Sequence, residues 1–149
     1  MRKLLDKAFL FLVFIAFLFI VVMFHTWNKI DVVEIPATAG KLTTWGVDSC
    51  DIKDNYAYIS AWSFPEDVRQ FENSLYVKTA DGAGYIKLKT QVYRRNQETA
   101  TMKTAGEFDN SGLVGAIRIL PWEKKTSKEI VMISKGSDGK LYRGDYACK

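Results

Sequence analysis

Few residues of this chain could supply nucleophilic or acid–base chemistry. His25 is the only histidine, and it lies directly after a long apolar run. Ser127-Lys128 and Ser134-Lys135 place a hydroxyl beside an amine, but adjacent residues of an extended segment point to opposite sides. The sequence has no G-x-S-x-G elbow, no phosphate-binding glycine loop and no H-E-x-x-H pair. We therefore expect no catalytic residues, no metal site and no cofactor.

Paired carboxylates are the remaining route to catalysis, because two such groups can cleave a glycosidic bond. The candidates are Glu66 with Asp67 and Glu107 with Asp109, all in polar segments typical of loops. Solvated loop carboxylates are the ordinary interpretation of such residues. An envelope enzyme, or an enzyme subunit, that acts on glycans through loop carboxylates is therefore the alternative hypothesis.

A binding surface has more support in the sequence. Residues 74–80 and 84–93 flank an Asp-Gly-Ala-Gly turn and predict a β-hairpin. Alternation places aromatic and basic residues on one of its faces: Tyr76, Lys78, Tyr85, Lys87, Lys89 and Tyr93. Arg94 and Arg95 follow, and Trp122 stands at a predicted strand end. We predict that these residues bind a ligand or partner; the alternative is a solvated face with edge lysines that deter sheet pairing.

Two details of this region follow from strand periodicity. If Gly82-Ala83 is the turn, Lys78 lies opposite Lys87, which favours a nearby anion. Alternation also places Val92 with the apolar residues of the hairpin. Trp62 lies in the middle of a strand among other aromatic residues, so we expect it in the core. For Trp122 the sequence leaves core packing and stacking on a sugar equally open.

An N-terminal apolar segment must hold the rest of the chain at a membrane. Residues 8–28 carry no formal charge, and a helix of that length covers about 30 Å, the thickness of the bilayer's hydrocarbon core. A cleaved signal would have a small-residue site close behind the apolar run, whereas the nearest such triplet begins at Ala37. We predict an uncleaved signal anchor. Basic residues among 1–7 place the N-terminus in the cytoplasm, with the rest outside.

The two cysteines, Cys50 and Cys148, lie near opposite ends of the part outside the membrane. An exterior compartment permits disulfides, so we predict that the two cysteines pair. Free buried thiols are the alternative. The formal net charge of +4 is modest and gives no indication of nucleic-acid binding.

The exterior part divides into a stalk or lead-in, residues 29–46, and one domain, residues 47–149. Within the lead-in, residues 30–35 could form a short strand. From Cys50 onward, short runs of β-branched and aromatic residues alternate with Gly, Asp, Asn and Ser. Five to seven strands are expected, with residues 94–107 as a long loop or edge strand. The fold class is therefore mainly β: one transmembrane helix followed by a small antiparallel β-sandwich or barrel-like domain.

One short motif carries a family resemblance. The segment Tyr58-Ile-Ser-Ala-Trp-Ser-Phe64, with the hairpin and the strand 112–120 after it, resembles the small extracytoplasmic β-sandwich domains of bacterial surface-polysaccharide proteins. In those domains the first strand often reads Gly-Trp-Ala, where this chain has Ala61 and Ser63 on either side of the tryptophan. The resemblance covers residues 51–143 and implies a non-catalytic accessory domain at a cell envelope.

These observations combine into one expectation. The chain is a single-pass protein of the bacterial inner membrane with a periplasmic or extracellular β domain. Its partners are the lipid bilayer and either a membrane-protein complex or a surface glycan. A pilus-like subunit is discounted, because the chain lacks a short leader ending in glycine and an acidic residue just inside the apolar helix.

Overall fold

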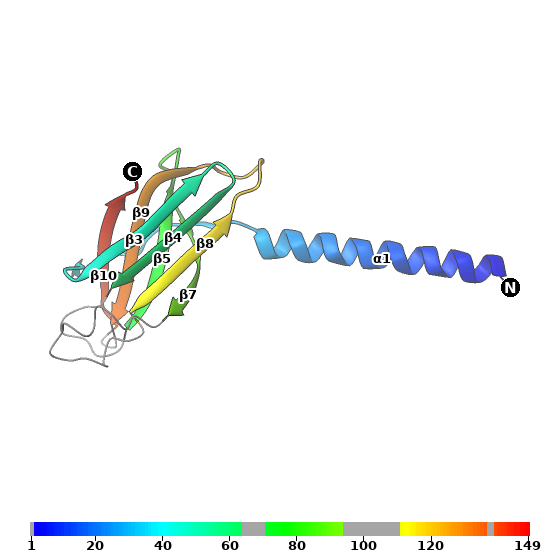
Figure 1. Ribbon diagram of the computed structural model, residues 1–149, viewed down its shortest axis with the longest axis horizontal. Helices are drawn as coiled ribbons and strands as arrows, with labels where there is room; N and C mark the ends of the chain where they lie inside the picture. The colour runs from blue at the N-terminus through cyan, green and yellow to red at the C-terminus, as the bar shows by residue number, and fades with distance from the viewer. Residues whose placement is uncertain (1, 64–70, 94–110, 137–138) are drawn as a thin grey trace.

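A computed structural model describes residues 2–63, 71–93, 111–136 and 139–149. Helix α1 (Arg2–Asn28) extends away from a β domain built from two sheets (Figure 1). Its segment Leu5–Asn28 contains an 18-residue stretch with a mean hydropathy of 2.9, none of which is buried. Among the described residues, this is the one helix with the length and composition to cross a membrane.

The β domain is a two-layered sandwich with ten strands in the described ranges, more than the five to seven expected. One sheet has the order β1 (Val32–Val33), β6 (Tyr85–Lys87), β5 (Phe71–Thr79), β9 (Thr126–Gly136), β10 (Leu141–Ala147) and β2 (Gly40–Lys41). The other has the order β3 (Trp45–Lys53), β4 (Tyr56–Ser63), β8 (Gly112–Arg118) and β7 (Lys89–Tyr93). All pairings are antiparallel except that of β2 with β10. The predicted mainly β fold with one N-terminal helix is confirmed.

The core between the sheets is aliphatic. Its fully buried members are Ile59, Leu75, Val77, Leu88, Leu113, Ile130 and Met132. From β4 it receives the small residues Ala57 and Ala61 on either side of Ile59. The prediction that Trp62 belongs to the core is wrong: it is half-buried on the opposite, outer face of β4, where its ring lies over Gly46. The inward residues Ala57, Ile59 and Ala61 pack in one cluster with large core residues of the other sheet.

The predicted hairpin exists only for its first part. The turn is centred on Asp81-Gly82, with Gly82 at a φ of 72°, so Lys78 lies opposite Tyr85 rather than Lys87. After Lys87 the chain leaves this sheet: Leu88 still donates its N–H to the Leu75 carbonyl at 2.9 Å, and β7 then pairs with β8 of the other sheet. Val92 consequently lies on an edge strand and is 54% exposed, which corrects its expected place on the apolar face.

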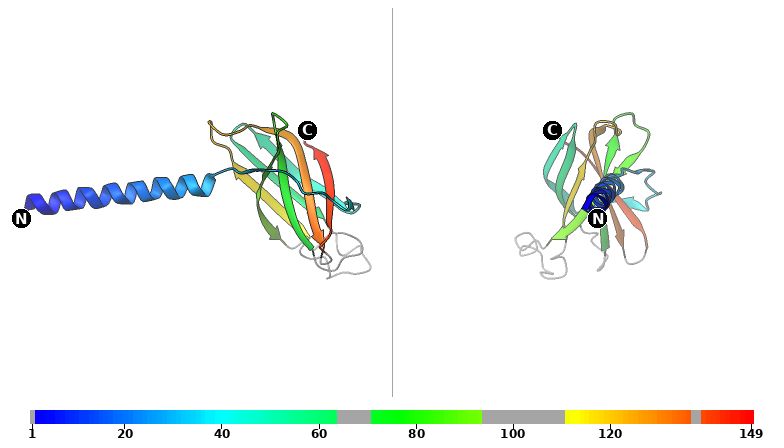
Figure 2. Two further views of the ribbon diagram at one scale, coloured as in Figure 1. Left: turned by 180° about the vertical axis from the view of Figure 1, so that it is seen from behind. Right: turned by 90° about the vertical axis from the view of Figure 1, so that its right-hand side faces the viewer.

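Residues 29–46, expected as a stalk, are part of the domain. Strand β1 lies at one edge of the six-stranded sheet and β2 at the other, so the segment 34–39 crosses the outer face of that sheet (Figure 2). Val131 and Ile133 point toward this outer face by alternation, and both are buried. The lead-in is therefore joined to the domain at both edges of this sheet, and its middle crosses the face toward which Val131 and Ile133 point.

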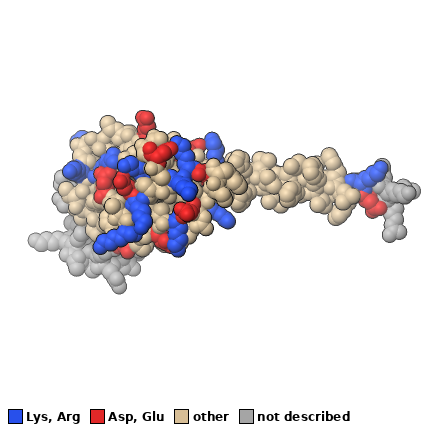
Figure 3. Space-filling model, turned by 90° about the horizontal axis from the view of Figure 1, so that it is seen from above, with Lys and Arg blue, Asp and Glu red and all other residues tan. Residues whose placement is uncertain are grey.

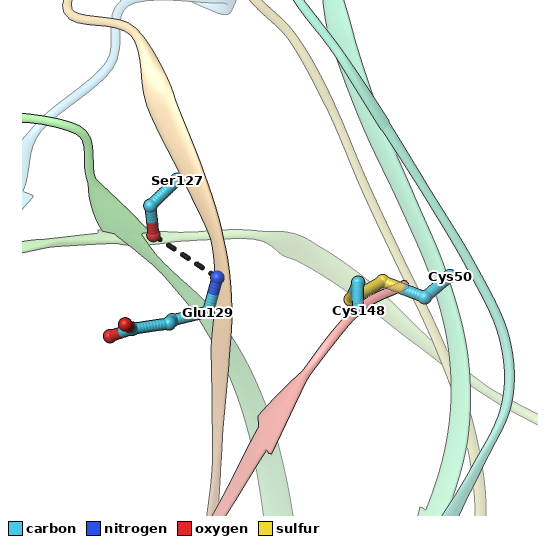
Figure 4. Close-up of a disulfide and its surroundings, with 4 residues drawn as sticks. All are labelled: Cys50, Ser127, Glu129 and Cys148. Carbon is cyan, nitrogen blue, oxygen red and sulfur yellow. Dashed lines mark hydrogen bonds between the residues drawn. A yellow bond between two sulfur atoms is a disulfide. The ribbon is translucent and has the colours of Figure 1, made fainter.

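The predicted disulfide between Cys50 and Cys148 is confirmed (Figure 4). It joins the edge strand β3 of one sheet to the end of β10 in the other, with the two Cα atoms 5.9 Å apart. The Cys148 N–H also donates to the Lys128 carbonyl at 2.8 Å. Nearby on β9, the Glu129 N–H donates to the Ser127 hydroxyl at 3.1 Å. The last residues of the chain are thereby held against both layers.

Candidate functional site

The predicted binding residues do not form one surface, because the chain changes sheets between Lys87 and Lys89. Tyr76, Lys78, Tyr85 and Lys87 lie on the six-stranded sheet. Lys89 and Tyr93 lie on the four-stranded sheet. Trp122 lies in the connection between β8 and β9. Arg94 and Arg95 are outside the described residues.

On the outer face of the six-stranded sheet, the charged residues pair with each other. Lys78 donates to the Glu129 carboxylate at 2.6 Å, which raises the pKa of the lysine. Arg143 binds Asp145 at 2.7 Å and donates to the Tyr85 hydroxyl at 3.2 Å. A shallow hollow of about 300 Å³ lies among these side chains. This face is thus occupied by its own ion pairs and by the crossing segment 34–39.

The outer face of the four-stranded sheet is aromatic. Strand β4 presents Tyr56, Tyr58 and Trp62 on this side, and β7 adds Tyr93, whose ring lies over Gly112. The Tyr93 hydroxyl is 3.2 Å from the Ser60 hydroxyl and donates to the Asp48 carboxylate. The sequence carried this signal, since the same β4 residues share one parity in the strand.

A groove lies where α1 meets this aromatic face, and we call it the junction groove. Its volume is about 740 Å³. Its walls come from five parts of the chain: Trp27, Asn28 and Lys29; Asp51; Asn55, Tyr56, Ala57 and Tyr58; Lys89; and Ala116, Ile117 and Arg118. Ala116 lies between Tyr58 and Lys89 in the pairing of β4, β8 and β7, so its small side chain leaves the floor open.

Lys89 connects the two sides of the junction groove. Its ammonium donates to the Trp27 carbonyl and lies 4.5 Å from the centre of the Trp27 ring. An ammonium over an indole face is a favourable cation–π contact. Arg118 and Lys29 add two more cations to the lining. Tyr58 is 42% exposed and adds an accessible aromatic ring. The groove can therefore hold a ligand that offers apolar or ring surface together with negative charge.

The one carboxylate in the groove lining is held by its neighbours. Tyr56 donates its hydroxyl to Asp51, and Lys53 lies 3.4 Å from the same carboxylate and donates to the Tyr56 hydroxyl at 2.7 Å. The hydrogen bond from Tyr56 is the main cause that lowers the pKa of Asp51, and Lys53 adds to it. Asp51 is thus an ionised structural group rather than a proton donor near neutral pH.

We expect Tyr56→Phe to raise the pKa of Asp51 toward the ordinary value of about 3.9, because the variant removes that hydrogen bond. In the native protein the contact stabilises the fold above the ordinary carboxyl pKa and is lost as the pH falls through the lowered one. A carboxyl ¹³C NMR titration of Asp51 measures the change. Tyr58→Phe, on the same strand face, is the matched control, and equal Asp51 titrations in both variants would contradict the assignment.

No family model, curated protein or solved structure matches this chain. The resemblance to surface-polysaccharide domains therefore stays a prediction.

The other groups that could supply chemistry are the loop carboxylates, metal-ligating side chains and serine hydroxyls. Glu66, Asp67, Glu107 and Asp109 lie outside the described residues, so the carboxylate hypothesis also stays a prediction. Within residues 2–63, 71–93, 111–136 and 139–149, no group of three His, Cys, Asp or Glu side chains could hold a metal ion. The buried hydroxyls of Ser63 and Ser134 are bonded to each other and to Asn73, with no basic side chain among these contacts.

Proposed function

We propose that this protein is a single-pass, membrane-anchored binding module of the cell envelope that performs no catalysis itself. In this proposal α1 is an uncleaved signal anchor with its N-terminus in the cytoplasm. Figure 3 supports this assignment, because charged side chains lie at the N-terminal end of α1 and on the β domain, with an uncharged stretch between them. The disulfide supports an exterior, oxidising compartment for the β domain.

The junction groove is the observation that carries the proposed activity. It is built jointly by the last turn of α1 and the four-stranded sheet, so its ligand must meet the protein at the membrane surface. Its lining combines rings that bury apolar area with cations that select negative charge. The partner we propose is an extracytoplasmic segment of a second membrane protein, because only a membrane-embedded partner also lies beside α1. An envelope glycan is the other occupant to test.

The test is photo-crosslinking of the full-length protein in native membranes. A benzophenone amino acid replaces Tyr58 in the groove or, as the matched control, Tyr76 on the six-stranded sheet. We expect one recurrent membrane-protein adduct from position 58 and none from position 76. An adduct that contains glycan instead would assign the groove to that ligand, and equal adducts at both positions would contradict a site in the groove.

We expect Ala116→Trp to abolish the position-58 adduct, because an indole on the groove floor fills the space between Tyr58 and Lys89. Ala116 is exposed, so the larger side chain meets no core residue. Ala147→Trp, also at an exposed alanine but on β10, is the matched control and keeps the adduct. Unchanged urea midpoints for both variants verify that each is folded.

A further inference from the structure

The connection between β8 and β9, residues 119–125, lies at the end of the domain from which α1 leaves. In Figures 1 and 2 this connection reaches about as far along the direction of α1 as the last turn of that helix. It thus lies at the level of the groove mouth but beside the groove, since none of its residues lines the groove. A bilayer crossed by α1 would meet this connection at the same depth as Trp27.

The residue at the tip of this connection is an exposed tryptophan. Trp122 is 73% exposed, close to the 70% of Trp27, whereas Trp45 and Trp62 are half-buried. A tryptophan has an apolar ring and a polar N–H, a combination that suits a membrane interface. The next exposed neighbours are Pro121, Lys124 and Lys125.

The connection is a fixed turn. The Glu123 N–H donates to the Leu120 carbonyl at 2.9 Å, and the Glu123 carboxylate accepts the Leu120 N–H at 2.8 Å. Pro121 occupies the second position of this turn, which its ring favours, and Trp122 the third. Both ends are also tied down: Ile119 donates to the Asn55 carbonyl at 2.8 Å, and the Lys125 carbonyl accepts the Ala80 N–H at 2.9 Å. The backbone that carries Trp122 is therefore held in place.

We propose that this turn docks the β domain on an anionic phospholipid surface, with Trp122 in the headgroup region and Lys125 on lipid phosphates. The inference depends on the proposed function in one respect, that α1 spans a bilayer. Tryptophan and lysine both favour the membrane interface, where an apolar body and a polar tip are satisfied together. Two acidic groups at this turn already have partners: Asp81 of the β5–β6 connection pairs with Lys124 at 2.9 Å, and Glu123 accepts the Leu120 N–H.

The contact of the Trp122 turn with lipid also affects the orientation of the junction groove. A helix alone leaves a domain free to turn about the helix axis, whereas a helix and a lipid-bound turn fix its orientation. The docked Trp122 turn then keeps the junction groove facing along the membrane plane, where a neighbouring membrane protein can reach it. The contact of Lys89 on β7 with Trp27 also helps to fix the orientation of the domain relative to α1.

The test uses the full chain, labelled with 5-fluorotryptophan, in nanodiscs that contain anionic phosphatidylglycerol and a gadolinium-chelating headgroup lipid. The four tryptophans give four ¹⁹F resonances, and Trp122→Phe identifies that of Trp122. We expect loss of most of the Trp122 and Trp27 signal intensity. Trp45 is the internal control, because β3 begins at the end of the domain away from α1 (Figure 1), and its resonance stays sharp.

The outcomes separate the two proposals. If Trp27 broadens and Trp122 stays as sharp as Trp45, the docking inference is overturned while the membrane anchor stands. If Trp27 also stays sharp, α1 is outside the bilayer and the proposed function itself fails. Lys125→Glu is expected to restore part of the Trp122 intensity, and Lys128→Glu, at an exposed lysine of β9, is the charge-matched control without effect. Equal broadening in zwitterionic discs would overturn the role of Lys125.

Discussion

Replacing Cys50 and Cys148 together by alanine is expected to lower the free energy of unfolding by about 4 kcal/mol. The bridge spans 98 residues of sequence, so its loss returns a large loop-closure entropy to the unfolded chain. It also joins the edge strand β3 to β10 of the other sheet, which no hydrogen-bonded ladder does. Urea unfolding of the full chain in detergent micelles, followed by tryptophan fluorescence, measures the change.

Reductant supplies the control for this prediction. Dithiothreitol should shift the unfolding midpoint of the native protein toward that of the double variant and leave the variant unchanged. A loss below about 1 kcal/mol would show that the reduced chain keeps compact structure in its unfolded state, contrary to the loop-closure account.

The disulfide and the mainly β fold could be predicted because their signals are local or compositional. With two cysteines in an exterior compartment, each can pair only with the other. Strands β9 and β10 are flanked by clear turn residues around Gly136 and Gly139. The apolar helix follows from length and charge alone. None of these inferences needs to know which strands of different sheets face each other.

The orientation of β4 was predicted wrongly for a physical reason. Both parities of this strand are apolar, one aromatic and one small, and size alone favours the aromatic set for the core. The choice depends on the facing layer, because the set that packs in one core with Leu75 and Met132 of the other sheet is Ala57, Ile59 and Ala61. This complementarity between the two sheets is a tertiary property that the sequence of one strand does not show.

The residues predicted to bind are divided between two sheets because one continuous alternating pattern contains two strands. Period-two alternation continues through Leu88, and that residue is buried whether the chain stays in its sheet or changes to the next. The junction groove was missed because it depends on contacts distant in sequence, such as that of Lys89 with Trp27, 62 residues apart. The sequence indicated the aromatic residues of the groove, but it did not indicate that α1 forms one of its walls.

Three buried polar side chains connect the two sheets and allow a sharper test of the core. Ser63 ends β4 in one layer, while Asn73 on β5 and Ser134 on β9 lie in the other. The Ser63 hydroxyl donates to the Asn73 side-chain oxygen at 2.9 Å, and the Asn73 amide donates to the Ser63 carbonyl at 3.1 Å. Ser134 donates to the same Asn73 oxygen. Every fully buried side-chain polar atom in the described ranges has a partner.

Asn73→Leu is therefore expected to cost about 2–4 kcal/mol of unfolding free energy, although it adds apolar volume to a buried site. The variant removes the acceptor that the two serine hydroxyls share and the donor to the Ser63 carbonyl. One hydroxyl can still donate to the other, so one hydroxyl and the Ser63 carbonyl lose a partner, and each orphaned buried group costs about 1–3 kcal/mol. The triple variant Ser63→Ala, Asn73→Leu, Ser134→Ala removes the hydroxyls as well, so it should recover at least half of that loss. Urea unfolding of both variants decides the question: if the triple variant is the less stable, cavity formation outweighs polar satisfaction where the two sheets meet.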